Sequence, residues 1–213
     1  MEQLKTTQNS ESSNVTLHDI IIEDFMDALD HGILVSNLAK LIARELAYDE
    51  EFCHEIALAG LLHDVGKLRL SKYLYGRRKN TLHIEEMKYV RMHSTFSYDI
   101  LKCKGYNEFI LESVYHHHEN YDGSGYPDNL IGKAIPIGAR ILRTCDVFAA
   151  LVSERPYRDA FDVDTAVELM IDEVKNFDIR IFLAFQRVVH SREFGAIREH
   201  VDLSQISTEL NKF

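Results

Sequence analysis

Cysteine, proline and tryptophan are scarce in this sequence. Among 213 residues there are three cysteines, three prolines and no tryptophan. The cysteines are odd in number and lack a Cys-x-x-Cys pair, which argues against a disulfide framework and favours reduced thiols in a cytoplasmic protein. Each lies in an apolar-patterned segment, so Cys53, Cys103 and Cys145 are expected to be small core side chains.

Long apolar runs and an excess of positive charge are also missing. No run reaches the ~18 apolar residues that a membrane helix needs, and residues 1–15 lack the hydrophobic centre of a secretory signal. The net charge of −10 argues against a protein that coats polymeric nucleic acid. A small anionic ligand remains compatible with this charge, because basic residues are concentrated between Lys67 and Arg91.

Helical periodicity dominates what is present. Apolar residues recur at three- and four-residue spacing, and no segment shows convincing strand alternation. The length suits one buried core. We therefore predict an all-α fold with a single helical domain in residues 16–190. A flexible tail, residues 1–15, precedes it, and a C-terminal extension, residues 191–213, follows it.

Local signals predict where the helices begin and end. Thr16 can cap a first helix, and Gly32 is expected to loosen the backbone before a second helix. The almost wholly apolar run before His63 predicts a central buried helix, and charged residues 70–81 predict an exposed loop. Further helices are expected over 82–101 and 107–115. The remaining start signals are Asp49 for the central helix, Pro136, Asp162 or Asp164, and Asp178.

The most informative stretch runs from His116 to Pro127. Three adjacent histidines are followed by Glu119 and by a turn with two glycines and a proline. Histidines delivered at a helix end are typical metal ligands, but short histidine tracts only hint at metal binding. On these residues alone, a metal site and a surface tract without a role carry equal weight.

His63 and Asp64 are the strongest matching pair. They end the most apolar helical run, where an ionisable pair is costly to bury unless it is paired or binds a metal. A metal site is therefore favoured over a structural core histidine. Gly66 lets the helix end, and a continued turn would direct the Lys67 ammonium to the same place. A lysine there is suited to stabilise phosphate charge or to protonate a leaving oxygen.

Other positions offer ligands at helical spacing. Asp27 and His31 are four apart and share a helix face, although solvent-exposed pairs of this kind are common. His93 falls on an apolar face, where a metal ligand and a structural histidine are equally compatible. Asp146 lies among apolar residues and needs a partner, for which a metal is suited. Asp64 would be the bridging ligand, because one carboxylate can span two metal ions.

These ligand types favour a particular chemistry. Oxygen and imidazole ligands without thiolates favour iron or manganese over structural zinc. Two or three such ions bind phosphate oxygens, lower the pKa of a bridging water and promote attack of the resulting hydroxide on phosphorus. Phosphoester hydrolysis is therefore expected. Arg155, Tyr157 and Arg158 follow nine to twelve residues after Asp146, and arginine forms bidentate contacts with phosphate.

The order of these motifs closely resembles the HD-GYP family of the HD phosphohydrolase superfamily. The run from His63 to Lys67 alone would indicate only the superfamily, but its combination with His117-His118-Glu119 and Gly125-Tyr126-Pro127 is highly specific. The resemblance extends over about residues 20–190. It implies an all-α domain with two or three metal ions, iron or manganese. The implied activity is hydrolysis of cyclic di-GMP to pGpG and often onward to GMP.

The resemblance also implies residue roles. Asp64 and Lys67 would take part in catalysis, and Lys67 would bind the substrate together with Arg155, Tyr157 and Arg158. The loop of Gly125, Tyr126 and Pro127 would shape the site and contact a protein partner. The implied metal ligands are Asp27, His31, His63, Asp64, His93, His117, His118 and Asp146.

The chain departs from the family pattern at a few positions. Asp27 stands where trinuclear members carry a longer glutamate, so a binuclear centre would limit the second step, pGpG to GMP. Asn120 replaces a basic residue that commonly follows His-His-Glu, and Ser97 replaces a glycine. His116 precedes the motif and is not expected to bind metal. No implied ligand is missing, so an active enzyme is expected.

Two other functions fit the same motifs. One is an HD phosphohydrolase for a different nucleotide, such as another cyclic dinucleotide, because nothing in the sequence fixes guanine recognition. The other is a catalytically weak receptor that binds a cyclic dinucleotide and signals through protein partners. The complete ligand set argues against a pure receptor, which has no need of Lys67 beside His63 and Asp64.

Overall fold

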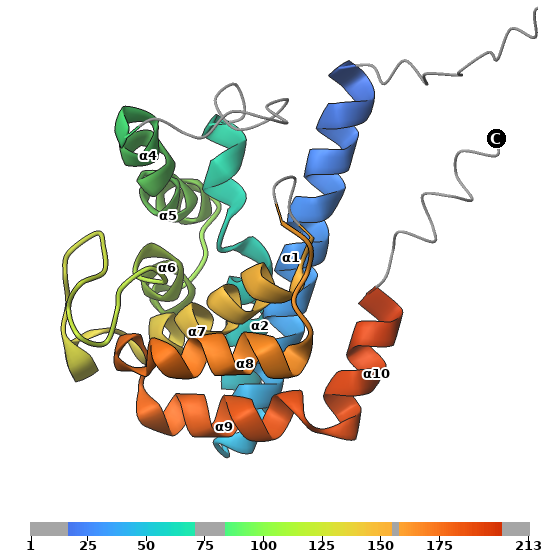
Figure 1. Ribbon diagram of the computed structural model, residues 1–213. Helices are drawn as coiled ribbons and strands as arrows, with labels where there is room; N and C mark the ends of the chain where they lie inside the picture. Colours follow the sequence, from blue (N-terminus) through green and yellow to red (C-terminus); the bar gives the residue numbers. More distant parts are fainter. Residues whose placement is uncertain (1–16, 71–83, 155–157, 202–213) are drawn as a thin grey trace, which may run out of the picture.

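The computed structural model describes residues 17–70, 84–154 and 158–201, and these residues form helices without a β-strand (Figure 1). The expected tail, the Thr16 cap and most of the expected basic loop lie outside the described residues. The helices are α1 (Leu17–Glu45), α2 (Glu50–Leu62), η1 (Val65–Leu70), α4 (Ile84–Arg91), α5 (His93–Cys103), α6 (Glu108–Tyr115), η2 (Gly132–Ala134), α7 (Ile137–Val152), α8 (Val163–Asp172), η3 (Val174–Asn176), α9 (Ile179–Val189) and α10 (Arg192–Val201).

Four predicted helix starts are confirmed by side-chain caps. Asp49, Asn107, Asp162 and Asp178 each accept a hydrogen bond from a backbone N–H in the first turn of α2, α6, α8 and α9. Such caps satisfy amide groups that have no partner within the helix. None of the helices in the described ranges is long and apolar enough to cross a membrane.

The predicted break at Gly32 is wrong, because α1 is continuous through it. Gly32 does not bend the helix; its missing side chain lets another helix pack closely against α1. A Cβ atom at Gly32 would lie 3.0 Å from the carbonyl oxygen of Leu61, and one at Gly60 would lie 3.0 Å from the Cα of Ser36. Two glycines on facing helices therefore let α1 and α2 lie close together, side by side in Figure 1.

The centre of the core is α7 and not, as predicted, α2. Helix α7 contacts α1, α2, α6, α8 and α9 and buries most residues between Gly138 and Ala149. In α2, by contrast, Leu61 is exposed. The cysteine prediction is confirmed for Cys53 and Cys145, which are buried, but is wrong for Cys103, which is exposed.

The predicted helix over 82–101 is two helices in the structure. Helix α4 ends at Arg91, and α5 begins at His93 after Met92, which caps α5 without a side-chain hydrogen bond. The interruption places His93 in the first turn of α5. There its Nδ1 lies 2.6 Å from the carbonyl oxygen of Val90, so the break helps to orient the imidazole.

Gly66 of η1 packs against the backbone of α5. We expect Gly66→Ala to destabilise the protein by about 1–3 kcal/mol. A Cβ atom there would lie 2.1 Å from the carbonyl oxygen of His93 and 2.5 Å from the amide nitrogen of Ser97, and backbone atoms cannot move aside easily. Urea unfolding would measure the change. Gly195→Ala is the matched control, because a Cβ at Gly195 would meet no atom of the described residues within 4 Å. Equal stability of the two variants would contradict this packing argument.

Candidate metal centre

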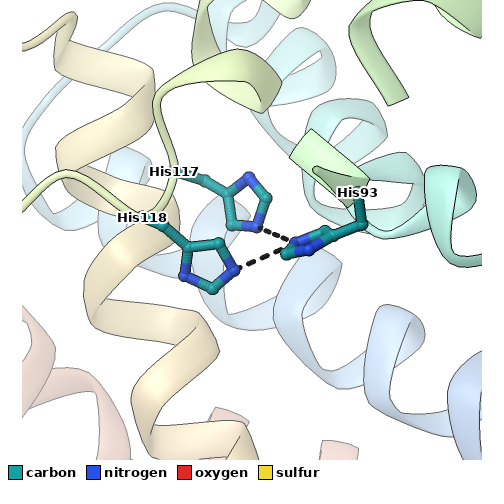
Figure 2. Close-up of side chains that lie close together, drawn as sticks. All are labelled: His93, His117 and His118. Carbon is teal, nitrogen blue, oxygen red and sulfur yellow. Dashed lines mark hydrogen bonds between the residues drawn. The ribbon is translucent and has the colours of Figure 1, made fainter. Parts of the chain in front are cut away.

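Three histidines converge from two helix ends. His93 lies in the first turn of α5, and His117 and His118 follow the end of α6. Figure 2 shows the three rings pointing toward one another, with the Nε2 atom of His93 3.3 Å from that of His117 and 3.0 Å from that of His118. Their ligand atoms all lie within 4.8 Å of one another, which is close enough for one metal ion.

A second group lies beside the first. His31 of α1, His63 at the C-terminal cap of α2 and the following Asp64 also place their ligand atoms within 4.8 Å of one another. The rings of His63 and His117 are 5.0 Å apart and nearly perpendicular, so the two groups adjoin.

Two carboxylates span both groups. The Oδ1 of Asp64 is 3.3 Å from Nε2 of His93 in the first group, and its Oδ2 is 3.3 Å from Nε2 of His63 in the second. Asp146 of α7 repeats the pattern, with Oδ1 3.1 Å from Nε2 of His31 and Oδ2 3.8 Å from Nδ1 of His118. Each carboxylate offers one oxygen to either group, which is the arrangement that two neighbouring metal ions require.

The hydrogen bonds of three imidazoles suit metal binding. His63, His93 and His117 each direct Nδ1 at a backbone carbonyl oxygen, at 2.6–2.7 Å. A carbonyl only accepts, so Nδ1 carries a proton in each ring and Nε2 is the atom left to face a metal ion. The Nε2 of His63 and the Oδ1 of Asp64 are buried without a hydrogen-bond partner, an arrangement that bound metal ions would satisfy. The carbonyls belong to Gly60, Val90 and Val114.

Burial sets the charge of most ligands. Desolvation lowers the pKa of His31 and His93, lowers that of His117 well below its usual range, and brings that of His118 to about 3. These rings are therefore neutral and ready to ligate at neutral pH. Burial would raise the pKa of Asp64, but Lys67 and His63 hold it well below the usual range.

His63 is the exception among the imidazoles. Burial lowers its pKa, but the negative charges of Asp64 and Asp146, whose carboxylate oxygens lie 3.3 and 3.6 Å from Nε2, outweigh burial and raise the pKa to about 10. The metal-free protein therefore carries a proton on His63 at neutral pH. A metal ion that binds this ring must displace the proton.

Metal binding is consequently expected to strengthen as pH rises from neutral toward the pKa of His63. Below a pKa of about 10 the ring is protonated, so uptake of the ion at His63 should release about one proton. Titration calorimetry with Mn²⁺ in buffers of different ionisation enthalpy would count the protons. His118, with a pKa of about 3, is already neutral at neutral pH and should release no proton when it binds the ion. An affinity that does not vary with pH between neutral and pH 9 would contradict this assignment.

Asp27, His116 and Lys67 lie outside the two histidine groups. Asp27 is exposed and lies in neither of the two groups, so its role in a third site stays a prediction. His116 lies outside both groups, with Nε2 3.2 Å from a carboxylate oxygen of Glu112. The Lys67 ammonium contacts Oδ2 of Asp64 and is 35% exposed, so it reaches from the surface to the centre.

The predicted phosphate-binding residues are less clearly connected to the centre. Arg155 and Tyr157 lie outside the described residues. Arg158 donates from Nη1 to the carbonyl oxygen of Leu151 at 3.0 Å and from Nη2 to that of Ala150 at 2.9 Å. It therefore caps the C-terminal end of α7, and a phosphate contact by Arg158 stays a prediction.

The Gly-Tyr-Pro loop shapes the site directly. The Tyr126 ring stacks on His118, with centroids 4.7 Å apart, and the Arg91 guanidinium lies 5.1 Å from the same ring. Glu119 is buried and accepts the backbone amides of Asp128 and Leu130, at 2.7 and 3.1 Å, which holds the loop against the end of α6. The loop thus fixes the orientation of a candidate ligand.

Sequence reasoning missed Arg143, a half-buried residue of α7. It lies three residues before Asp146 and donates from Nε to the Asn120 side chain at 2.9 Å. The three-residue spacing, which puts Arg143 and Asp146 on one helix face, was the available signal. The contact with Asn120 had no sequence signal, because it joins residues 23 positions apart.

Comparisons with known proteins agree with this geometry. The profile of a family described as HD domain matches residues 5–181. The cyclic di-GMP phosphodiesterase response regulator of Xanthomonas campestris is 40% identical over 136 residues, which cover 62% of this chain and 35% of that protein. A cyclic di-GMP phosphodiesterase of Pseudomonas aeruginosa is 32% identical, over 78% of this chain and 40% of that protein.

The chain is also similar to phosphodiesterases named for another cyclic dinucleotide and to proteins of known structure. A 3′3′-cGAMP-specific phosphodiesterase of Vibrio cholerae is 34% identical, over 71% of this chain and 36% of that protein. An HD-GYP-type protein of Bdellovibrio bacteriovorus has a similar fold, with a TM-score of 0.65 at 18% identity over 84% of this chain and 58% of that one.

The similarity covers most of this chain but only part of each relative. The chain spans well under half the length of these curated relatives. Within the chain, the HD domain profile covers most of the sequence, including all eight implied metal ligands. The chain belongs to the HD domain family.

Proposed function

We propose that this protein is a metal-dependent phosphodiesterase that hydrolyses cyclic di-GMP to pGpG, with GMP as a slower second product. One observation carries the proposal: Asp64 and Asp146 each offer one oxygen to either histidine group, as a two-metal phosphoesterase centre requires. The names of the Xanthomonas and Pseudomonas relatives, both cyclic di-GMP phosphodiesterases, support the substrate.

The proposed centre holds two divalent ions, iron or manganese. His93, His117 and His118 would hold one ion, and His31 and His63 the other, with Asp64 and Asp146 as shared ligands. When bound, the ions would supply Lewis-acid polarisation of the phosphate and an activated water. Nitrogen and oxygen donors without thiolate support iron or manganese. Asp27 lies in neither group and is exposed, so the proposal includes no third ion.

The chain itself would contribute charge and position. The depressed pKa values of Asp64 and Asp146 keep both carboxylates ionised, which favours retention of cations. Lys67 would stabilise negative charge on the scissile phosphate or donate a proton to the leaving oxygen, because its ammonium reaches Asp64 from the exposed side.

A single purification tests the proposal. The protein would be isolated without oxygen, its metal quantified by mass spectrometry, and turnover of cyclic di-GMP followed with Fe²⁺ or Mn²⁺ by chromatography of pGpG and GMP. About two ions per chain and formation of pGpG are expected. Tight binding of cyclic di-GMP without turnover would favour a receptor, and absence of both would refute the substrate assignment.

A second candidate substrate is 3′3′-cGAMP. It is favoured by the relatives of Vibrio cholerae that carry this specificity in their names. The same assay with both dinucleotides compares kcat/KM directly. A higher kcat/KM for 3′3′-cGAMP would replace cyclic di-GMP as the preferred substrate and leave the phosphodiesterase proposal intact.

A further inference from the structure

Arg143 is a half-buried cation that the proposed two-metal centre does not use. Its side chain lies on the same face of α7 as Asp146, but no ion pair within 4.0 Å joins the two residues. Its only hydrogen bond to the described residues runs from Nε to Oδ1 of Asn120, at 2.9 Å. In the described part of the chain, neither terminal nitrogen of the guanidinium has a hydrogen-bond partner.

Asn120 is itself held in one orientation. Its Nδ2 donates to the hydroxyl of Ser124 at 2.9 Å, and that hydroxyl donates to Asp122 at 2.6 Å. The amide oxygen is therefore turned toward Arg143, and the Nε contact fixes the plane of the guanidinium. A fixed guanidinium plane with two unused terminal nitrogens matches the spacing of two phosphate oxygens.

The partner is also neutral. Asn120 accepts a hydrogen bond without cancelling the positive charge, whereas a carboxylate at this position would cancel it. Burial lowers the pKa of Arg143, which indicates that holding the cation here has an energetic cost. The negative charge of Asp146 raises the pKa of Arg143, and bound metal ions would match that charge. An uncompensated cation beside the centre suits an anionic group of the substrate.

We infer that Arg143 binds the second phosphodiester of the cyclic dinucleotide, the one that is not hydrolysed. The inference rests on the proposed function. A cyclic dinucleotide carries two phosphodiesters on one ring. When one of them lies at Asp64 and Asp146, the other needs a cation outside the ligand set. Arg143, three residues before Asp146 on α7, is a cation that does not belong to that set. Arg143 would therefore select doubly charged cyclic substrates over simple phosphodiesters.

Arg143→Met tests the inference by equilibrium binding and by kinetics. Titration of the metal-loaded protein with a slowly hydrolysed phosphorothioate analogue of cyclic di-GMP should show binding about 10- to 100-fold weaker than in the wild type. The KM for cyclic di-GMP should rise by a similar factor with little change in kcat. Arg143→Met should also lower kcat/KM for bis(p-nitrophenyl) phosphate, which has a single phosphodiester, much less than for cyclic di-GMP. The two fold-losses should differ by at least about a factor of ten.

Asn120→Asp provides a second, sharper variant. It keeps an acceptor for Nε, removes the amide group that donates to Ser124, and adds a negative charge that would pair with the guanidinium. If Arg143 binds phosphate, Asn120→Asp should weaken binding of the analogue while metal content stays at the wild-type value. Arg180→Met, an exposed arginine of α9, is the matched control and should change neither quantity.

The outcomes separate this inference from the proposed function. Wild-type turnover together with unchanged analogue binding by Arg143→Met would overturn the role of Arg143 and leave the phosphodiesterase standing. An equal loss with both substrates would overturn it as well, by assigning Arg143 to the metal centre. A wild-type protein that neither binds nor hydrolyses a cyclic dinucleotide would overturn the proposed function and this inference together.

Discussion

Asp64→Asn should reduce hydrolysis of cyclic di-GMP by at least about 10³-fold and lower the metal content below two ions per chain. Asp64 offers one oxygen to His93 and the other to His63, so it contacts both histidine groups. Asparagine has nearly the same size but only one oxygen and no charge. Metal analysis by mass spectrometry and single-turnover assays would measure the two losses.

Asp99→Asn is the control for Asp64→Asn, because Asp99 is an exposed carboxylate on α5. It should retain the metal content and rate of the wild type. Circular dichroism would establish that both variants fold. An Asp64→Asn protein that is folded and still hydrolyses cyclic di-GMP at the wild-type rate would refute the two-metal centre.

Lys67→Met should lower kcat by about 10²- to 10³-fold while the metal content stays unchanged. The Lys67 ammonium contacts Asp64 but cannot ligate a metal while protonated, so its contribution would be to charge on the phosphate or the leaving oxygen. Anaerobic kinetics with cyclic di-GMP, together with metal analysis, would separate this effect from loss of the ions.

Two further variants sharpen the Lys67 prediction. Lys67→Arg keeps the charge and should recover part of the rate, and Lys104→Met removes an exposed lysine from the end of α5 and should have no effect. A Lys67→Met protein that has lost its metal would assign Lys67 to the stability of the centre instead of the reaction. One with normal kcat would exclude both roles.

Helix starts were largely predictable because they depend on neighbouring residues. The caps at Asp49, Asn107 and Asp178 are hydrogen bonds between a side chain and an amide two or three positions away. Gly32 misled the prediction because its role is not local. Its missing side chain accommodates the carbonyl of Leu61 on another helix, which no pattern around residue 32 encodes.

The candidate ligands were also predictable, although their grouping was not. Ionisable residues inside apolar helical runs, such as His63 and Asp146, signal a buried partner wherever they occur. The exposure of Cys103 and the capping of α7 by Arg158 were not foreseen. Each depends on which other elements pack nearby, and periodicity does not specify that.

The sequence alone determined the helical class and most helix starts, because these follow from helical periodicity and local hydrogen bonding. It also named candidate ligands, whose role as ligands stays a prediction, from the cost of burying charge. Tertiary packing decided which atoms meet. It brought His31 within 3.1 Å of Asp146 across 115 residues, aligned the Nε2 atoms of three histidines, and set Arg143 against Asn120. The direction of a side chain follows from its own backbone, but its distance from a partner depends on how whole helices pack.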